Sequence, residues 1–179
     1  MKRALVGVVV LLIAAVGLRA QTPKPYPERM KLEPFIGDWV SQGEAKATPL
    51  GPAGKITGKA SGKWILDGFA LQWEYSTTTA EGKVVTGREI DCYDPVTRTF
   101  PARWFDTGGA YTDGVYIPNG NVIVFQGTTT EATRKYGFKQ TYTYAPDFNS
   151  YTYKDEISMD GKTWIPASEA KGTRVKPAK

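Results

Sequence analysis

The chain has 179 residues, with 23 Lys and Arg, 18 Asp and Glu, one Cys and no His. This length is typical of a single domain, and such a domain buries enough surface to fold without a disulfide framework. The absence of histidine excludes Ser-His-Asp and Cys-His catalytic triads, and it excludes zinc or haem held by histidine.

The first 20 residues are typical of a secretory signal peptide. Residues 1–3 are positively charged at two positions, residues 4–18 are almost entirely apolar, and Leu18-Arg19-Ala20 resembles a signal-peptidase site. The apolar run is short for a membrane span, which needs about 20 residues. We therefore predict a cleaved signal and a periplasmic or secreted protein with no stable membrane span. A retained anchor is the alternative, because Leu18 is larger than the residue preferred there.

The charge of the remaining chain is close to neutral. Without Lys2, Arg3 and Arg19 the chain keeps 20 basic and 18 acidic side chains, so the net charge falls from +5 to +2. This balance gives no indication of nucleic-acid binding. Cys92 has no second cysteine with which to form a disulfide, and we interpret it as a buried small hydrophobic side chain, with a reactive thiol as the alternative.

In chain order, the predicted elements are an extended tether, one short helix and a series of strands. Residues 21–27 are rich in proline and are expected to be extended, and residues 28–35 are expected to form one or two helical turns. After residue 37, alternating strand signals recur about every 12 residues between Gly, Pro, Asn and Asp turns. The ten predicted strands are residues 38–47, 55–66, 69–78, 83–93, 99–106, 110–117, 121–130, 134–144, 150–158 and 163–175.

Turn residues and edge effects favour one closed sheet. Asp67-Gly68 is expected to be a two-residue hairpin turn, and Pro118-Asn119-Gly120 is expected to turn the sixth strand into the seventh. Closure of ten antiparallel strands removes unpaired edge groups. We therefore predict an all-β fold, an antiparallel up-and-down barrel of about ten strands, as a single domain over residues 28–176.

The two ends of this domain contain a candidate closure contact. Gly37 and Trp39 lie at the start of the first strand, and Arg174 lies at the end of the last. These strands are neighbours in a closed barrel, so the Arg174 guanidinium is expected over the Trp39 ring, a contact worth about 0.5 to 2 kcal/mol. The Gly-x-Trp opening with a closing-strand arginine resembles the lipocalin and calycin superfamily.

A longer series of motifs resembles the bacterial DUF1579 family over nearly all of the mature chain. The motifs are Phe35-Ile36-Gly37-Asp38-Trp39, Trp64-Ile65-Leu66-Asp67-Gly68, Tyr93-Asp94, Asp160-Gly161-Lys162-Thr163-Trp164 and Thr173-Arg174. The resemblance implies a lipocalin-like barrel. It implies no activity, because the family has none assigned.

Aromatic side chains make up 12% of the chain and are the main ligand-binding candidates. If the larger apolar face of each strand turns inward, they line a cup for an apolar or flat ligand, and the alternative is that they fill the barrel. A buried Arg103 would bind a carboxylate bidentately. The predicted ligand-binding residues are Trp73, Tyr75, Trp104, Phe125, Phe138, Tyr142, Tyr153 and Arg103, with Tyr151 in the same aromatic set.

Several charged residues lie within predicted strands. A charge that faces the interior must be paired or must serve a ligand, whereas a solvated outer face explains most of them equally well. In the strand predicted at residues 83–93, turning the more apolar face inward places Ile90 inside the barrel. An interior rich in polar groups would instead place Glu89 and Asp91 inside. The charged residues in question are Glu74, Arg88, Glu89, Asp91, Arg103, Arg134 and Glu156.

The sequence contains no recognisable metal or phosphate site. Residues 106–113 are rich in oxygen ligands but do not match a calcium loop, and residues 58–63 lack the spacing of a phosphate loop. We therefore predict no metal and no cofactor.

Three functions remain open. The first is an exported protein that binds a small hydrophobic or amphipathic ligand inside the barrel. The second is a structural or interaction module of the cell envelope, with a packed interior and an exposed apolar patch. The third is an enzyme that uses Asp, Glu or Tyr as acid or base, which predicts an interior carboxyl with a raised pKa. We favour the first.

Overall fold

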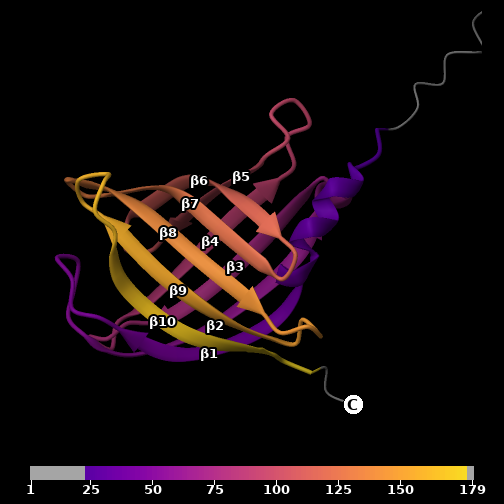
Figure 1. The fold of residues 1–179 in the computed structure, drawn as a ribbon. Coiled ribbons are helices and arrows are strands. Elements are labelled where there is room, and N and C mark those ends of the chain that lie inside the picture. The colour runs from indigo at the N-terminus through magenta and orange to yellow at the C-terminus, as the bar shows by residue number, and fades with distance from the viewer. Residues whose placement is uncertain (1–22, 177–179) are drawn as a thin grey trace, which may run out of the picture.

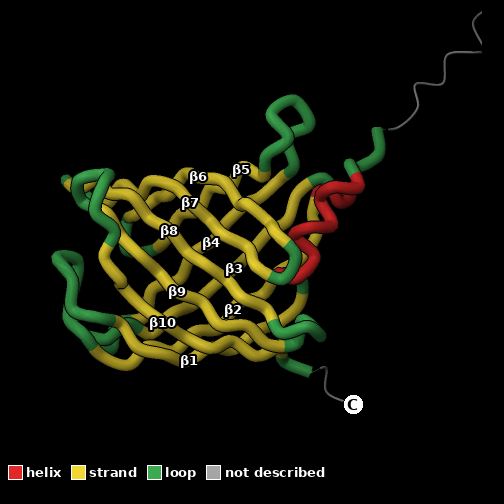
Figure 2. Tube along the Cα trace, viewed as in Figure 1, coloured by secondary structure: helices red, strands yellow, loops and turns green. Residues whose placement is uncertain are grey.

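The computed structural model describes residues 23–176, which form a closed barrel of ten antiparallel strands (Figure 1 and Figure 2). The predicted signal peptide and the first two residues of the predicted tether lie outside the described residues. Within residues 23–176, no helix has both the length and the apolar character needed to cross a membrane.

Each strand pairs with its neighbours in sequence, and β1 pairs with β10 to complete the ring. The predicted barrel is therefore confirmed, with strand ends that differ by at most two residues from those expected. The strands are β1 (Gly37–Ala45), β2 (Gly54–Ile65), β3 (Ala70–Thr78), β4 (Val84–Cys92), β5 (Phe100–Asp106), β6 (Ala110–Asn119), β7 (Val122–Glu131), β8 (Arg134–Tyr144), β9 (Ser150–Ser158) and β10 (Ile165–Arg174).

One end of the barrel is covered by the 3₁₀ helix η1 (Pro27–Phe35), as Figure 1 shows. Pro27 stands at the first helical position, where its missing N–H group costs no hydrogen bond. Pro34 lies inside the helix, which is a 3₁₀ helix rather than an α-helix. The helix buries Leu32 and Phe35 against the barrel end.

Two turns differ from the prediction. The β2–β3 connection is longer than Asp67-Gly68, because the last paired residues are Ile65 and Ala70. Its 3₁₀ turn η2 (Leu66–Gly68) has positive φ angles of 50°, 54° and 87°, so three consecutive left-handed residues carry the chain around this corner.

The second difference is in the β6–β7 hairpin. Pro118 and Asn119 still belong to β6, and the turn is Gly120-Asn121, because Asn119 pairs directly with Val122. Proline is tolerated near a strand end, where few ladder hydrogen bonds are lost. Gly120 supplies the positive φ of 60° that this tight turn needs.

Glycines on the inner wall allow aromatic rings to lie flat against neighbouring strands. Tyr75 is directly opposite Gly87, and a Cβ atom on Gly87 would lie 2.3 Å from the Tyr75 ring. Tyr151 and Gly172 repeat the arrangement, with a distance of 2.1 Å. Because any other residue would collide with these rings, the two glycines determine where the rings sit.

The half of the interior next to η1 is packed with aromatic side chains. Phe35 is 2% exposed and lies at its centre. Its ring centroid is 5.1 Å from that of Tyr116, 5.2 Å from that of Tyr142 and 5.5 Å from that of Trp73. Edge-to-face and tilted contacts of this kind stabilise a core beyond simple burial. The helix therefore closes this end with a side chain as well as with its backbone.

The ring of strands closes through Arg174. Trp39 and Arg174 are paired residues of β1 and β10, and the guanidinium carbon lies 4.3 Å from the centroid of the Trp39 ring. The same guanidinium donates hydrogen bonds to the carbonyl oxygens of Ile36, of Pro34 at 3.3 Å and of Phe148 at 3.1 Å. One side chain thus connects the end of η1, the first strand and the β8–β9 turn.

Substitution of Arg174 by Ala is expected to lower the free energy of unfolding by about 1 to 4 kcal/mol. The variant loses the cation–π contact and leaves carbonyl groups near the barrel end without their donor. Chemical denaturation measures the change, with Lys171→Ala, an exposed position on the same strand, as the control. Equal unfolding midpoints for Arg174→Ala and the wild type would contradict the role assigned to Arg174.

Candidate functional site

A cavity of about 620 Å³ occupies the half of the barrel away from η1. Its volume lies within the range of about 300 to 1,000 Å³ that is common for small-molecule sites. Loops that include residues 48–52, 79–81 and 108 surround its mouth. Trp39, Trp73, Tyr142 and Tyr151 belong both to the packed core and to the cavity wall, so they form its floor.

Most of the aromatic residues proposed from the sequence meet in this cavity. Phe125 is the exception, because it is fully buried behind the wall, with its ring centroid 4.7 Å from that of Trp104. It supports a lining residue and does not line the cavity itself. The predicted aromatic residues that line the cavity are Trp73, Tyr75, Trp104, Phe138, Tyr142, Tyr151 and Tyr153.

Arg103 is not part of the cavity, contrary to the prediction. It follows Ala102, which is buried, and precedes Trp104, which lines the cavity, so strand alternation turns Arg103 outward. Its side chain is 60% exposed and forms an ion pair with Asp113, its paired residue on β6. An anionic ligand therefore has no Arg103 guanidinium to bind inside the barrel.

The fourth strand turns its acidic face inward. Glu89 is 4% exposed and Asp91 is 1% exposed, whereas Ile90 between them is 38% exposed. The choice of an inward Ile90 from apolar character is therefore wrong. The reason is visible only in the fold, where Gly87 must face inward beneath Tyr75 and the alternation of β4 then places Glu89 and Asp91 inside.

Arg134 lies at the mouth of the barrel, and the other charged strand residues lie on the outer surface, as the solvated alternative proposed. Glu74 forms an ion pair with Arg88 at 2.5 Å, and Glu156 forms one with Lys139 at 2.6 Å. Exposed pairs of this kind contribute about 0 to 1 kcal/mol each. They mark the outer face of the barrel and leave Glu89 and Asp91 as the inward exceptions of that set.

The Glu89 and Asp91 carboxyls share a site that disfavours two negative charges. Burial raises the pKa of both groups, and the charge of Glu89 raises the pKa of Asp91 further. Burial raises the pKa of Tyr116 on β6, and the charge of Glu89 raises it further. Glu89 lines the cavity, and its Oε1 is buried without a hydrogen-bond partner.

A third carboxyl, Asp155 on β9, lines the cavity as well. Burial raises its pKa from 3.8 to about 6, although the Ser168 hydroxyl donates a hydrogen bond to it and partly offsets the shift. Its Oδ1 is buried and has no partner. This residue was not among the sequence candidates, but its position between Tyr153 and Ile157 on the inward face of an alternating strand would have identified it.

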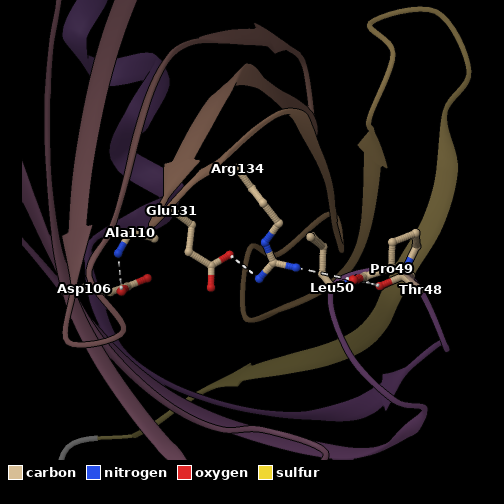
Figure 3. Close-up of polar contacts among 7 residues, drawn as sticks. All are labelled: Thr48, Pro49, Leu50, Asp106, Ala110, Glu131 and Arg134. Carbon is tan, nitrogen blue, oxygen red and sulfur yellow. Dashed lines mark hydrogen bonds and ion pairs between the residues drawn. The ribbon is translucent and has the colours of Figure 1, made fainter.

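The mouth of the cavity is bridged by Arg134. Its guanidinium donates a hydrogen bond to the Pro49 carbonyl at 3.3 Å and pairs with Glu131 at 3.4 Å (Figure 3). The contact joins the β7–β8 hairpin to the β1–β2 connection, where Leu50 N–H donates to Thr48 Oγ1. Arg134 therefore holds two loops together over the entrance.

The groups that the cavity presents to a ligand are aromatic rings and carboxyls. Aromatic rings accept apolar, flat or cationic groups, and the two cavity carboxyls accept hydrogen bonds or exchange protons. Across residues 23–176, no group of three or more His, Cys, Asp or Glu side chains is placed to hold a metal ion. Cys92 is half-buried, faces away from this cavity and is a free thiol with a pKa raised by burial.

Asp155→Asn is expected to stabilise the protein at neutral and higher pH. The folded pKa of Asp155 is raised, so its ionised form weakens folding as pH rises from about 4 to about 6 and above. The variant should exceed the wild type in free energy of unfolding by about 1 to 3 kcal/mol near pH 8 and match it near pH 4. Urea denaturation at both pH values measures this. Glu156→Gln, on the outer face of the same strand, should show no such pH-dependent gain.

The fold of this chain is similar to that of solved structures. It is similar to the crystal structure of Rv2717c from M. tuberculosis, with a TM-score of 0.64 and 16% identity, covering 86% of this chain and 100% of that one. It is also similar to the S-type phycobiliprotein lyase CPES from Guillardia theta, with a TM-score of 0.54 and 12% identity over the same shares of the two chains. At these identities the likeness concerns the fold alone.

The sequence comparisons identify the family. None of the curated proteins matches the chain. The family model described as "Protein of unknown function (DUF1579)" matches residues 24–174, a range that contains η1 and all ten strands of the barrel. The chain therefore belongs to the DUF1579 family.

Proposed function

We propose that this protein binds a small hydrophobic or amphipathic ligand in the cavity of its barrel. The observation that carries the proposal is the cavity of about 620 Å³, closed at its floor by packed rings and open at its mouth. Eight aromatic side chains line it, the seven predicted ones and Trp39, which is a composition typical of ligand pockets. A core built only for stability would fill such a space, because voids weaken folding.

The same observation counts against a purely structural module. That alternative expects an interior filled from end to end, whereas the barrel contains a cavity of about 620 Å³ in addition to the rings packed around Phe35. The exposed apolar residues Val96 and Leu66 lie on separate turns, and Phe105 and Tyr111 form one exposed pair on β5 and β6. Single exposed apolar residues are common on protein surfaces and do not indicate a partner.

The proposal includes export of the protein to the periplasm or the outside of the cell. The charged start, apolar run and Ala20 of residues 1–20 support it. In that location the ligand would be a compound of the envelope or the surroundings. Amino-terminal sequencing of the protein from its host tests the cleavage after Ala20.

A second candidate is an acid–base enzyme on the same scaffold, and Glu89 favours it. The carboxyl of Glu89 is buried, lines the cavity and has a raised pKa, which is how a general acid or base active near neutral pH is tuned. The binding function requires no chemical change in the ligand. The two candidates therefore differ in whether the bound compound leaves the barrel altered.

Ala60→Trp is expected to abolish ligand binding, because Ala60 lines the cavity and an indole there would fill much of it. Native mass spectrometry of protein purified from its host, followed by solvent extraction, measures the bound compound. Thr57→Trp, an exposed position on the same strand, is the matched control and should keep the ligand. Absence of any bound compound in the wild type, or equal occupancy in the two variants, would contradict the proposal.

The recovered compound also separates the binding function from the enzyme. Incubation of the compound with wild-type protein should leave it unchanged if the protein only binds it. Conversion by the wild type and loss of conversion in Glu89→Gln would instead establish the second candidate. Chromatography of the extracted compound before and after incubation gives this result.

A further inference from the structure

Two carboxyl oxygens on the cavity wall have no protein partner. Glu89 is 4% exposed, and its Oε1 is buried, unpaired and part of a residue that lines the cavity. Asp155 has an unpaired buried Oδ1 and lines the same cavity from the strand β9. A buried carboxyl oxygen without a donor costs stability, so its retention in a ligand cavity points to a donor on the ligand.

The two carboxyls line the same cavity, together with Tyr142 of its floor. Burial raises the pKa of Tyr142, and the charges of Glu89 and Asp155 raise it further. The surroundings of the two carboxyls are acidic or neutral. The titratable and polar groups that face them are Asp91 from β4, Tyr75 from β3, Tyr116 from β6, Gln140 and Tyr142 from β8, Tyr151 and Tyr153 from β9 and Ser168 from β10.

Among the described residues, no basic side chain balances the negative charge of these two carboxyls in an ion pair. In the ion pairs formed within residues 23–176, neither Glu89 nor Asp155 takes part. Three lysines lie along the cavity: Lys46 pairs with Glu169 at 3.4 Å, Lys83 pairs with Glu81 at 2.6 Å, and Lys59 is exposed to solvent. The interior therefore has a negative potential, and the mouth has no excess of positive charge that would repel a cation.

Aromatic rings surround these carboxyls. Trp73 and Trp104 are the paired neighbours of Glu89 on β3 and β5, and both line the cavity. The negative face of an aromatic ring attracts cations, most strongly for tryptophan. Carboxyls and indole rings together form the chemical complement of an ammonium group, whereas a carboxylate ligand would find repulsion and no guanidinium.

We propose that the cavity binds a cationic amphipathic ligand, a protonated amine on an apolar or aromatic body, with its ammonium group held by Glu89 and Asp155. The inference rests on the proposed binding function and specifies the class of its ligand. The apolar body lies against the remaining rings of the wall, among them Phe138 and Tyr153. The ammonium group supplies the donors that the two unpaired oxygens lack.

The binding of such a cation depends on pH through the protein. An alkyl amine stays protonated below about pH 9, whereas the carboxyls have raised pKa values and are neutral in more acidic solution. A cation favours the ionised carboxyls, so its affinity should rise as pH increases from about 5 to about 8. The affinity of a neutral ligand should change little over the same range.

Three dansyl probes that differ in charge test the proposal. Dansylcadaverine is the cation, its N-acetyl derivative is the neutral counterpart, and dansylaminoundecanoic acid is the anion. Fluorescence titration of the full chain near pH 7.5 should give about tenfold or tighter binding of the cation than of the other two. Glu89→Gln combined with Asp155→Asn should remove this preference, and Glu74→Gln, an outer-face carboxyl, should keep it.

The outcomes separate this inference from the proposed function. Binding of all three probes with equal affinity, or a preference for the anion, would overturn the cationic ligand and leave the binding function standing. Failure of all three probes to bind, together with a host-purified protein that carries no compound, would contradict the binding function itself. The charge series in the wild type decides the question even where the double variant does not fold.

Discussion

The barrel depends on one constraint, which is that the last strand must pair with the first. A ten-stranded sheet left open would expose two rows of unpaired backbone groups, and pairing of β1 with β10 removes both. Arg174 strengthens this seam by covering the Trp39 ring and donating to carbonyl groups of η1 and of the β8–β9 turn. The helix that covers the end of the barrel is therefore held by the same side chain that supports closure.

Closure divides the interior into two halves with different properties. Phe35 fills the half next to η1, so the aromatic rings there have partners on every side and form a rigid floor. In the part of the chain from residue 23 to residue 176, no corresponding element enters from the other end, where short connections surround the mouth and Arg134 bridges two of them. A cavity remains because inward glycines such as Gly87 allow the rings to lie against the wall rather than meet at the axis.

The carboxyls inside the barrel are costly for folding and informative about function. Burial of Glu89, Asp91 and Asp155 raises their pKa values, which means that the fold disfavours their ionised forms. Apolar residues at these positions would avoid this cost. Two of the three carboxyls line the cavity with an unpaired oxygen, so their chemistry is available to a ligand or to a proton transfer.

The ten strands, their up-and-down order and most of the aromatic wall could be predicted from the sequence, because strand alternation and turn residues act locally. The closing pair Trp39 and Arg174 followed from closure, which makes the first and last strands neighbours. The tertiary structure decided which face of β4 turns inward, placed Arg103 outside and left half of the barrel open. The physical reason is that an inward or outward direction depends on what the neighbouring strands place there. Tyr75 needs a glycine opposite it on β4, and this contact, absent from the local pattern of β4, turns Glu89 and Asp91 into the interior.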